Sequence, residues 1–182
     1  MRLVVGGIAL CGVLLAATPA LANDPATANV IQIGAGVRYG IEMNDGDFNP
    51  WGVGLGLDGG YTLPMAVYVG GNFEYFFGDS VTLAGIETTG NVWQLTAEGG
   101  YDIGLGPIVL RPKLGAGIGT LRGESCFSGT CSSDSSSKFA LTPGVKAMFF
   151  TPSFSLSVDT RYDLIFADET AKALIFTVGI GF

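Results

Sequence analysis

Residues 52–61 read GVGLGLDGGY, and glycine occupies every second position through the first half of this stretch. The stretch contains a G-x-G-x-x-G spacing, from Gly54 to Gly59, which in a dinucleotide-binding fold lies between a strand and a helix. Here residues 61–64 continue to a proline turn, and a further strand-like segment follows. The motif match is therefore accidental, and the alternation itself indicates a β-strand with small residues on one face.

The same two-residue period recurs in eight runs, and no run has the period of a helix. The runs cover residues 30–43, 51–63, 65–77, 92–105, 108–121, 138–150, 154–167 and 173–182. Each is long enough for a tilted membrane-spanning strand, which needs about 9–11 residues. Short links alternate with mostly longer polar links at 44–50, 78–91, 122–137 and 168–172. This alternation is typical of outer-membrane barrels, whose short turns face the periplasm.

One face of every run is free of charge, and the opposite face carries twelve charged residues. These are Arg38, Glu42, Asp58, Glu74, Glu98, Asp102, Arg111, Lys113, Lys146, Asp159, Arg161 and Asp163. Glycine is the commonest residue on the charged face, which suits a narrow lumen better than a solvated surface. We therefore predict an all-β fold, an eight-stranded antiparallel up-and-down transmembrane β-barrel with a polar, glycine-rich, charge-paired lumen.

The lumen charges are expected to pair, because unpaired charges are costly at low dielectric. Hairpin geometry places Asp102 opposite Arg111, with Glu98 and Lys113 nearby, and places Lys146 opposite Asp159. The simpler interpretation is a structural network that fills the lumen. The alternative is a gated, charge-lined pore, which would require rearrangement because side chains just fill an eight-stranded barrel.

Aromatic residues gather near both ends of the runs, as the interfacial girdles of a membrane barrel do. At the outer end these are Tyr39, Trp51, Tyr75, Phe77, Trp93, Phe139 and Phe166. At the periplasmic end they are Tyr61, Tyr101, Phe149, Phe154 and Phe182.

The first 22 residues have the features of a secretory signal peptide. Arg2 precedes an apolar stretch at 3–17, and residues 20–22 read Ala-Leu-Ala, a small-x-small cleavage site. We predict a cleaved signal peptide at 1–22 and a single barrel domain at 23–182. Without Arg2, eight basic residues face 16 acidic ones, which argues against a nucleic-acid partner.

Two cysteines remain in the mature chain, Cys126 and Cys131. In an exported protein they predict a disulfide that closes a small loop. A metal site is the weaker interpretation, because the chain has no histidine and no third mature cysteine. The surrounding segment, residues 126–137, is low in complexity and is expected to be a mobile loop.

The whole mature chain resembles the small outer-membrane barrels of the OmpA and OmpX type. The most specific element is the ending 175-IFTVGIGF-182, in which alternate residues lead to a terminal aromatic: Phe176, Val178, Ile180 and Phe182. In that family such an ending is read by the barrel-assembly machinery. Ile175 and Thr177 depart from the usual signal. The resemblance implies residence in the cell outer membrane, contact with its lipid and lipopolysaccharide, and a monomer.

The resemblance also implies a non-enzymatic role, either structural or in surface interaction, meaning adhesion or envelope integrity. A porin-like channel for small solutes is the alternative. A lipid-modifying barrel enzyme is a third possibility, but the barrel enzymes of this type use a histidine, and this chain has none. We expect no catalytic residue, no metal and no cofactor.

Overall fold

The computed structural model describes residues 31–43, 49–83, 86–127, 130–167 and 170–182, so the predicted signal peptide lies outside it. The strands are β1 (Ile31–Glu42), β2 (Gly52–Thr62), β3 (Val67–Phe76), β4 (Ser80–Leu83), β5 (Ile86–Tyr101), β6 (Ile103–Leu105), β7 (Ile108–Phe127), β8 (Thr130–Phe150), β9 (Ser155–Ile165) and β10 (Ala171–Gly181). In these ranges, no helix is long and apolar enough to cross a membrane.

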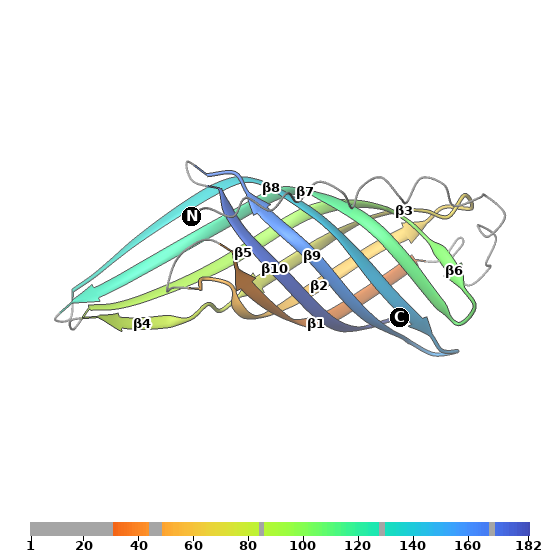
Figure 1. Ribbon diagram of the computed structural model, residues 1–182, viewed down its shortest axis with the longest axis horizontal. Helices are drawn as coiled ribbons and strands as arrows, with labels where there is room; N and C mark the ends of the chain where they lie inside the picture. The colour runs from red at the N-terminus through yellow and green to blue at the C-terminus, as the bar shows by residue number, and fades with distance from the viewer. Residues whose placement is uncertain (1–30, 44–48, 84–85, 128–129, 168–169) are drawn as a thin grey trace, which may run out of the picture.

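The ten strands make the eight walls of a closed antiparallel barrel (Figure 1). β3 and β4 pair with successive parts of β5, and β5 and β6 pair with successive parts of β7, so each of these couples forms one wall. β1 pairs with both β2 and β10, which closes the ring. The predicted eight-stranded barrel is therefore confirmed.

The strands are strongly staggered around the barrel. Paired positions starting at Lys146 of β8 run through β9, β10, β1, β2, β3, β5 and β7 and return to β8 at Ser136, ten residues away. A closed barrel needs such a stagger because its strands tilt relative to the barrel axis. Side chains at one level of the lumen therefore come from positions that are not direct partners in the sheet.

The outer wall is apolar, and the charged face points inward, as predicted. Large apolar side chains on the outside are well exposed, among them Ile33 (63%), Leu57 (59%) and Val178 (67%). Inward neighbours on the same strands are buried, including Arg38 and Thr177. Since lipid is the medium that accepts such an apolar outer wall, the burial pattern matches a membrane barrel.

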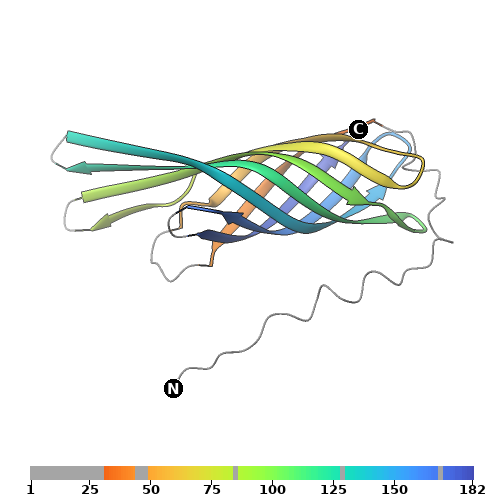
Figure 2. The ribbon, with the colours of Figure 1, turned by 90° about the horizontal axis from the view of Figure 1, so that it is seen from above.

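The two ends of the barrel differ. At one end, which we call the turn end, residues 63–66, 106–107 and 151–154 make short connections. At the other, which we call the loop end, the hairpins β4–β5 and β7–β8 extend well beyond the remaining strands (Figure 2). Most of the predicted links at 78–91 and 122–137 are therefore paired strand rather than loop. Residues in both hairpins have cross-strand partners, which the low complexity of residues 126–137 had obscured for the second hairpin.

Candidate functional site

The interior of the barrel contains the twelve charged residues singled out from the sequence. Ten of them are buried, whereas Asp58 is partly exposed and Glu42 lies partly exposed at the loop end of β1. Among the described residues, all of these side chains except Glu42 form four separate groups.

The central group joins two arginines and two carboxylates from three walls, β1, β3 and β9. Glu74 on β3 accepts hydrogen bonds from Arg38 Nη1, at 2.8 Å, and from Arg161 Nη2. Arg161 Nε donates to Asp163 Oδ1 at 2.9 Å, and Arg38 Nη2 donates to Asn72 Oδ1 at 2.7 Å. The group is electrically balanced, which makes burial of these charges tolerable.

The turn-end group is built around Arg111 on β7. Its guanidinium makes two hydrogen bonds to Asp102, at 2.5 and 2.8 Å, and its carbon lies 3.7 Å from the ring centroid of Tyr68. Gln32 and Thr62 also accept hydrogen bonds from Arg111 Nη2. The structure thus brings Asp102 and Arg111 together as hairpin geometry suggested, and the group fills the turn end of the lumen.

Each of the two lysines binds a carboxylate that hairpin geometry alone did not give, although Glu98 was expected near Lys113 and is confirmed there. Lys146 lies opposite Asp159 in the β8–β9 register, yet its Nζ donates to Asp58 on β2 at 2.6 Å. Lys113 Nζ instead lies 2.6 Å from Asp159 Oδ2 and 3.0 Å from Glu98 Oε1. The expected Lys146–Asp159 ion pair is therefore wrong, because strand tilt brings side chains of other walls equally close.

Glycine on the inner wall makes room for these side chains, and this explains the GVGLGLDGGY stretch. A Cβ on Gly56 would overlap the guanidinium of Arg38. A Cβ on Gly60 would come within 2.5 Å of the Tyr68 ring, and one on Gly54 within 2.7 Å of Phe76. The alternate glycines of β2 therefore form the wall against which the large inward residues of β1 and β3 lie.

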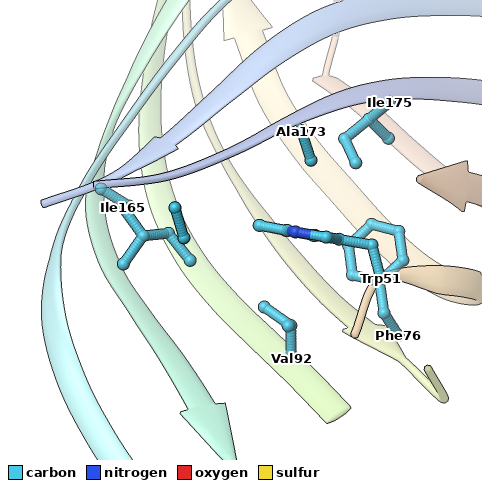
Figure 3. Packing of buried hydrophobic residues seen from close by; sticks show 8 residues of the cluster. Trp51, Phe76, Val92, Ile165, Ala173 and Ile175 are labelled. Atoms are coloured by element: carbon cyan, nitrogen blue, oxygen red, sulfur yellow. The ribbon is translucent and has the colours of Figure 1, made fainter. Parts of the chain in front are cut away.

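The loop end of the lumen is closed by an apolar cluster, which we call the lid (Figure 3). Its members are Trp51, Phe76, Val92, Ala140, Ile165, Ala171, Ala173 and Ile175. The rings of Trp51 and Phe76 meet edge to face with centroids 5.3 Å apart. The polar lumen predicted from the sequence thus ends below an apolar layer.

Trp51 was expected in the outer aromatic girdle, and this expectation is wrong because its exposed fraction is 0%. Gly52 has a positive φ of 51°, which breaks the alternation at the start of β2 and turns Trp51 inward. Asn49 holds this segment in place by donating to Gly40 O and accepting from Trp51 N. The Asn-Pro-Trp-Gly sequence is the signal that could have indicated a turn before the strand.

The two cysteines lie at the tip of the β7–β8 hairpin. Cys126 and Cys131 are direct partners in the register, and their sulfur atoms are 2.02 Å apart. Glu124 Oε1 lies 3.8 Å from Cys126 Sγ. The segment expected to be a mobile loop is instead the paired end of β7 and β8 in its described part.

The residues of the C-terminal signal line the outside of β10. Phe176, Val178, Ile180 and Phe182 are all exposed on the apolar wall, between 41% and 75%. Phe182 is fixed to β1 by two backbone hydrogen bonds with Ile33. The side chains are therefore presented outward along one strand at the seam where the barrel closes.

A closed barrel of eight walls, an apolar exterior and an ion-paired interior together define a small transmembrane β-barrel protein of the outer-membrane class. The chain belongs to the outer membrane protein beta-barrel domain family, whose model matches residues 8–182. This membership places the chain in the outer membrane. The comparison with curated proteins finds no match.

Solved structures of small outer-membrane proteins share the fold. Ail, the attachment invasion locus protein of Yersinia pestis, is 23% identical, with a TM-score of 0.60, over 85% of this chain and 98% of its own. A major outer membrane protein from Thermus thermophilus is 15% identical, with a TM-score of 0.62, over 84% and 99%. Neisserial surface protein A is 16% identical, with a TM-score of 0.54, over 83% and 94%.

Proposed function

We propose that this protein is a non-enzymatic outer-membrane barrel whose function is surface interaction, carried by the sheet that it presents beyond the membrane. The observation that supports this role is the continuation of β4, β5, β7 and β8 as one four-stranded sheet past the lid. Residues 130–135 of β8 and residues 122–123 of β7 are exposed there. Within the described residues, β8 pairs with β9 only from Ala140 onward, and no other described strand covers the outer part of this edge of β8.

A shortened hairpin tests this proposal. A variant lacking residues 124–133 removes paired positions equally from β7 and β8 and leaves the membrane-spanning part intact. Bacteria displaying the full chain should adhere to cultured epithelial cells more strongly than bacteria displaying the variant. Outer-membrane amounts and heat-modifiable gel migration should match. Equal adherence of the two strains at equal surface amounts would contradict the proposal.

Envelope integrity is the other part of the proposed role, and it belongs to the barrel rather than to the hairpin. Loss of the whole chain should increase sensitivity to bile salts, whereas the shortened variant should restore resistance. A deletion strain as resistant as its parent would remove envelope integrity from the proposal.

The channel alternative is less well supported, because both ends of the lumen are filled. The lid lies at the loop end and the Arg111–Asp102–Tyr68 group at the turn end. The protein inserted in planar bilayers should give no conductance steps at either polarity, under conditions in which a known porin does. Reproducible steps would favour the channel. All of the inward carboxylates except Glu42 and Asp58 are buried, which also argues against access by an enzyme substrate.

Contacts during biogenesis follow from the C-terminal strand. We propose that the barrel-assembly machinery recognises the outward aromatics of β10, after cleavage of the signal peptide, and that the folded barrel sits in lipid and lipopolysaccharide as a monomer. Phe182→Ala should lower the assembled amount severalfold. Phe154→Ala, an exposed aromatic at the same end, is the matched control. Equal losses for both variants would argue against a specific signal.

A further inference from the structure

The Cys126–Cys131 disulfide lies near the tip of a hairpin that extends beyond the barrel, where thiols in the surrounding medium can reach it (Figure 2). Cys131 is exposed, and Cys126 is half-buried. Because the two residues are direct partners in the register, their side chains project from the same face of the hairpin. Exposed disulfides are the ones that exchange with thiols most readily.

One carboxylate stands directly beside this bond. Glu124 Oε1 lies 3.8 Å from Cys126 Sγ, and a carboxylate oxygen of Glu124 and both sulfur atoms lie within 4.8 Å of one another. Glu124 and Cys126 share one face of β7, because side chains alternate along a strand. Within the described ranges, Glu124 forms no ion pair that would offset its charge. The negative charge therefore acts on the sulfur atoms.

Exchange begins when a thiolate attacks one of the two sulfur atoms. At the exposed Cys131 Sγ, the incoming sulfur forms a bond and the bond to Cys126 breaks. The electron pair leaves on Cys126 Sγ, which takes a proton from water, so the product is a mixed disulfide at Cys131. A second thiolate attacks the incoming sulfur and releases a small disulfide, and the Cys131 thiolate also takes up a proton.

The Glu124 carboxylate opposes this reaction at either sulfur atom. It repels a thiolate that attacks Cys126, and it disfavours the departure of a thiolate from Cys126 when Cys131 is attacked. A second negative charge on the attacking thiol adds to the repulsion. An ammonium group on the thiol is attracted to the carboxylate instead, which brings its thiolate close to the disulfide.

We propose that the Cys126–Cys131 bond is a site of thiol exchange at which Glu124 sets the specificity. Thiols that carry a positive charge react with the bond, and thiols that carry a negative charge are repelled. The substrate class is therefore the cationic thiols. This chemistry is separate from the adhesion and envelope roles, because it needs only the outer end of the hairpin.

Three small thiols of similar size test the specificity. They are cysteamine, which is cationic, 2-mercaptoethanol, which is neutral, and 2-mercaptoethanesulfonate, which is anionic. The folded protein in neutral detergent micelles at low salt is exposed to each at equal thiolate concentration, and the modified and freed cysteines are followed by mass spectrometry. The rate constant should be about tenfold higher for cysteamine than for the sulfonate, because the charges differ by two a few ångströms from the carboxylate. Equal rate constants for the three thiols would overturn the proposal.

Glu124→Gln should lower this ratio by about fivefold, because it removes the carboxylate beside the sulfur atoms. Asp134→Asn is the matched control, since it removes the same charge from the hairpin. Asp134 lies three residues from Cys131 on β8 and so on the opposite face. The control should keep the ratio of the unmodified protein. A Glu124 variant with the full ratio, or an Asp134 variant with an equal loss, would contradict the role of Glu124.

Concentrated salt gives an answer without any substitution. In sodium chloride at about 1 M, where charges are screened beyond about 3 Å, the ratio for the unmodified protein should fall toward one. A ratio that does not change with salt would show that the preference is not electrostatic, and it would overturn the proposal.

Discussion

At the scale of single residues, the inner wall depends on where side chains are missing. Gly56 leaves the space that the Arg38 guanidinium occupies, and Arg38 in turn pairs with Glu74. Gly99 lies on the lipid face, where no neighbouring side chain needs the space. A Cβ on Gly99 would meet no atom within 4 Å. Gly56 and Gly99 therefore differ in how well they should tolerate a side chain, because Gly56 faces the filled lumen and Gly99 faces lipid.

Gly56→Ala is expected to destabilise the barrel by about 3 kcal/mol, because the added methyl group displaces Arg38 from a buried ion pair. Gly99→Ala is the control and should have no measurable cost. Urea titration in lipid vesicles gives both free energies of unfolding. If the two variants prove equally stable, the role assigned to Gly56 is wrong.

Glu74→Gln is expected to cost on the order of 3–5 kcal/mol, because it leaves two buried guanidinium groups, Arg38 and Arg161, with one remaining carboxylate. Asp134→Asn removes an exposed charge from the β7–β8 hairpin and should cost less than about 0.5 kcal/mol. The same titration compares them. A Glu74 variant as stable as the Asp134 variant would show that the central group does not stabilise the fold.

At the scale of elements, the prolines show how a strand tolerates a missing donor. The β8–β9 ladder skips Thr142 and Pro143, and β5 and β6 are separated opposite Pro112. The register is the same on both sides of each gap. Of the bulge or widened pair that the two prolines predict, no bulge is present, because no residue is added at either gap. The ladder is interrupted instead, since a proline removes one ladder hydrogen bond.

Loss of the Cys126–Cys131 disulfide should affect the β7–β8 hairpin and leave the rest of the barrel unchanged. Replacement of both Cys126 and Cys131 by serine should increase protease cleavage within the hairpin and change the unfolding free energy of the barrel by less than about 0.5 kcal/mol, because the link closes a very short loop. Ser125→Ala with Ser132→Ala, at the adjacent paired positions, is the control. Loss of heat-modifiable migration in the serine variant would show that the tip supports the whole barrel.

At the scale of the whole molecule, closing the sheet into a barrel surrounds two different layers with one apolar outer wall. One layer is the apolar lid, and the other is the lumen with its buried ion pairs. Groups from opposite walls meet only because the sheet closes: Lys146 reaches Asp58, and Arg161 reaches Glu74. The sheet alone would bring neither pair together. The lumen is thus a core, although its middle is polar.

The two tryptophans report on this arrangement, since Trp51 lies in the lid and Trp93 on the outer wall. In vesicles of brominated lipid, a Trp51→Phe variant, whose remaining fluorescence comes from Trp93, should be strongly quenched. A Trp93→Phe variant should be weakly quenched by the lipid and by aqueous acrylamide. Strong quenching of Trp51 by the lipid would show that Trp51 belongs to the outer girdle and that the lid does not close the lumen.

Alternation and run length were enough to predict the barrel, the strand faces and the inward position of every lumen charge. These properties are local, because a strand shows its two faces within a few residues. The same reasoning found the Asp102–Arg111 pair, whose members are separated by one turn. It could not find the Trp51 lid, because a single positive φ at Gly52 reversed the side chain.

The remaining features were decided by the tertiary structure. The Lys113–Asp159 and Lys146–Asp58 pairs and the balance of the four charge groups depend on strand tilt and ring closure, which relate residues far apart in sequence. The sequence alone therefore determined which residues face the lumen. Only the closed barrel determined which of them meet there, because that choice depends on distances across the lumen rather than along the chain.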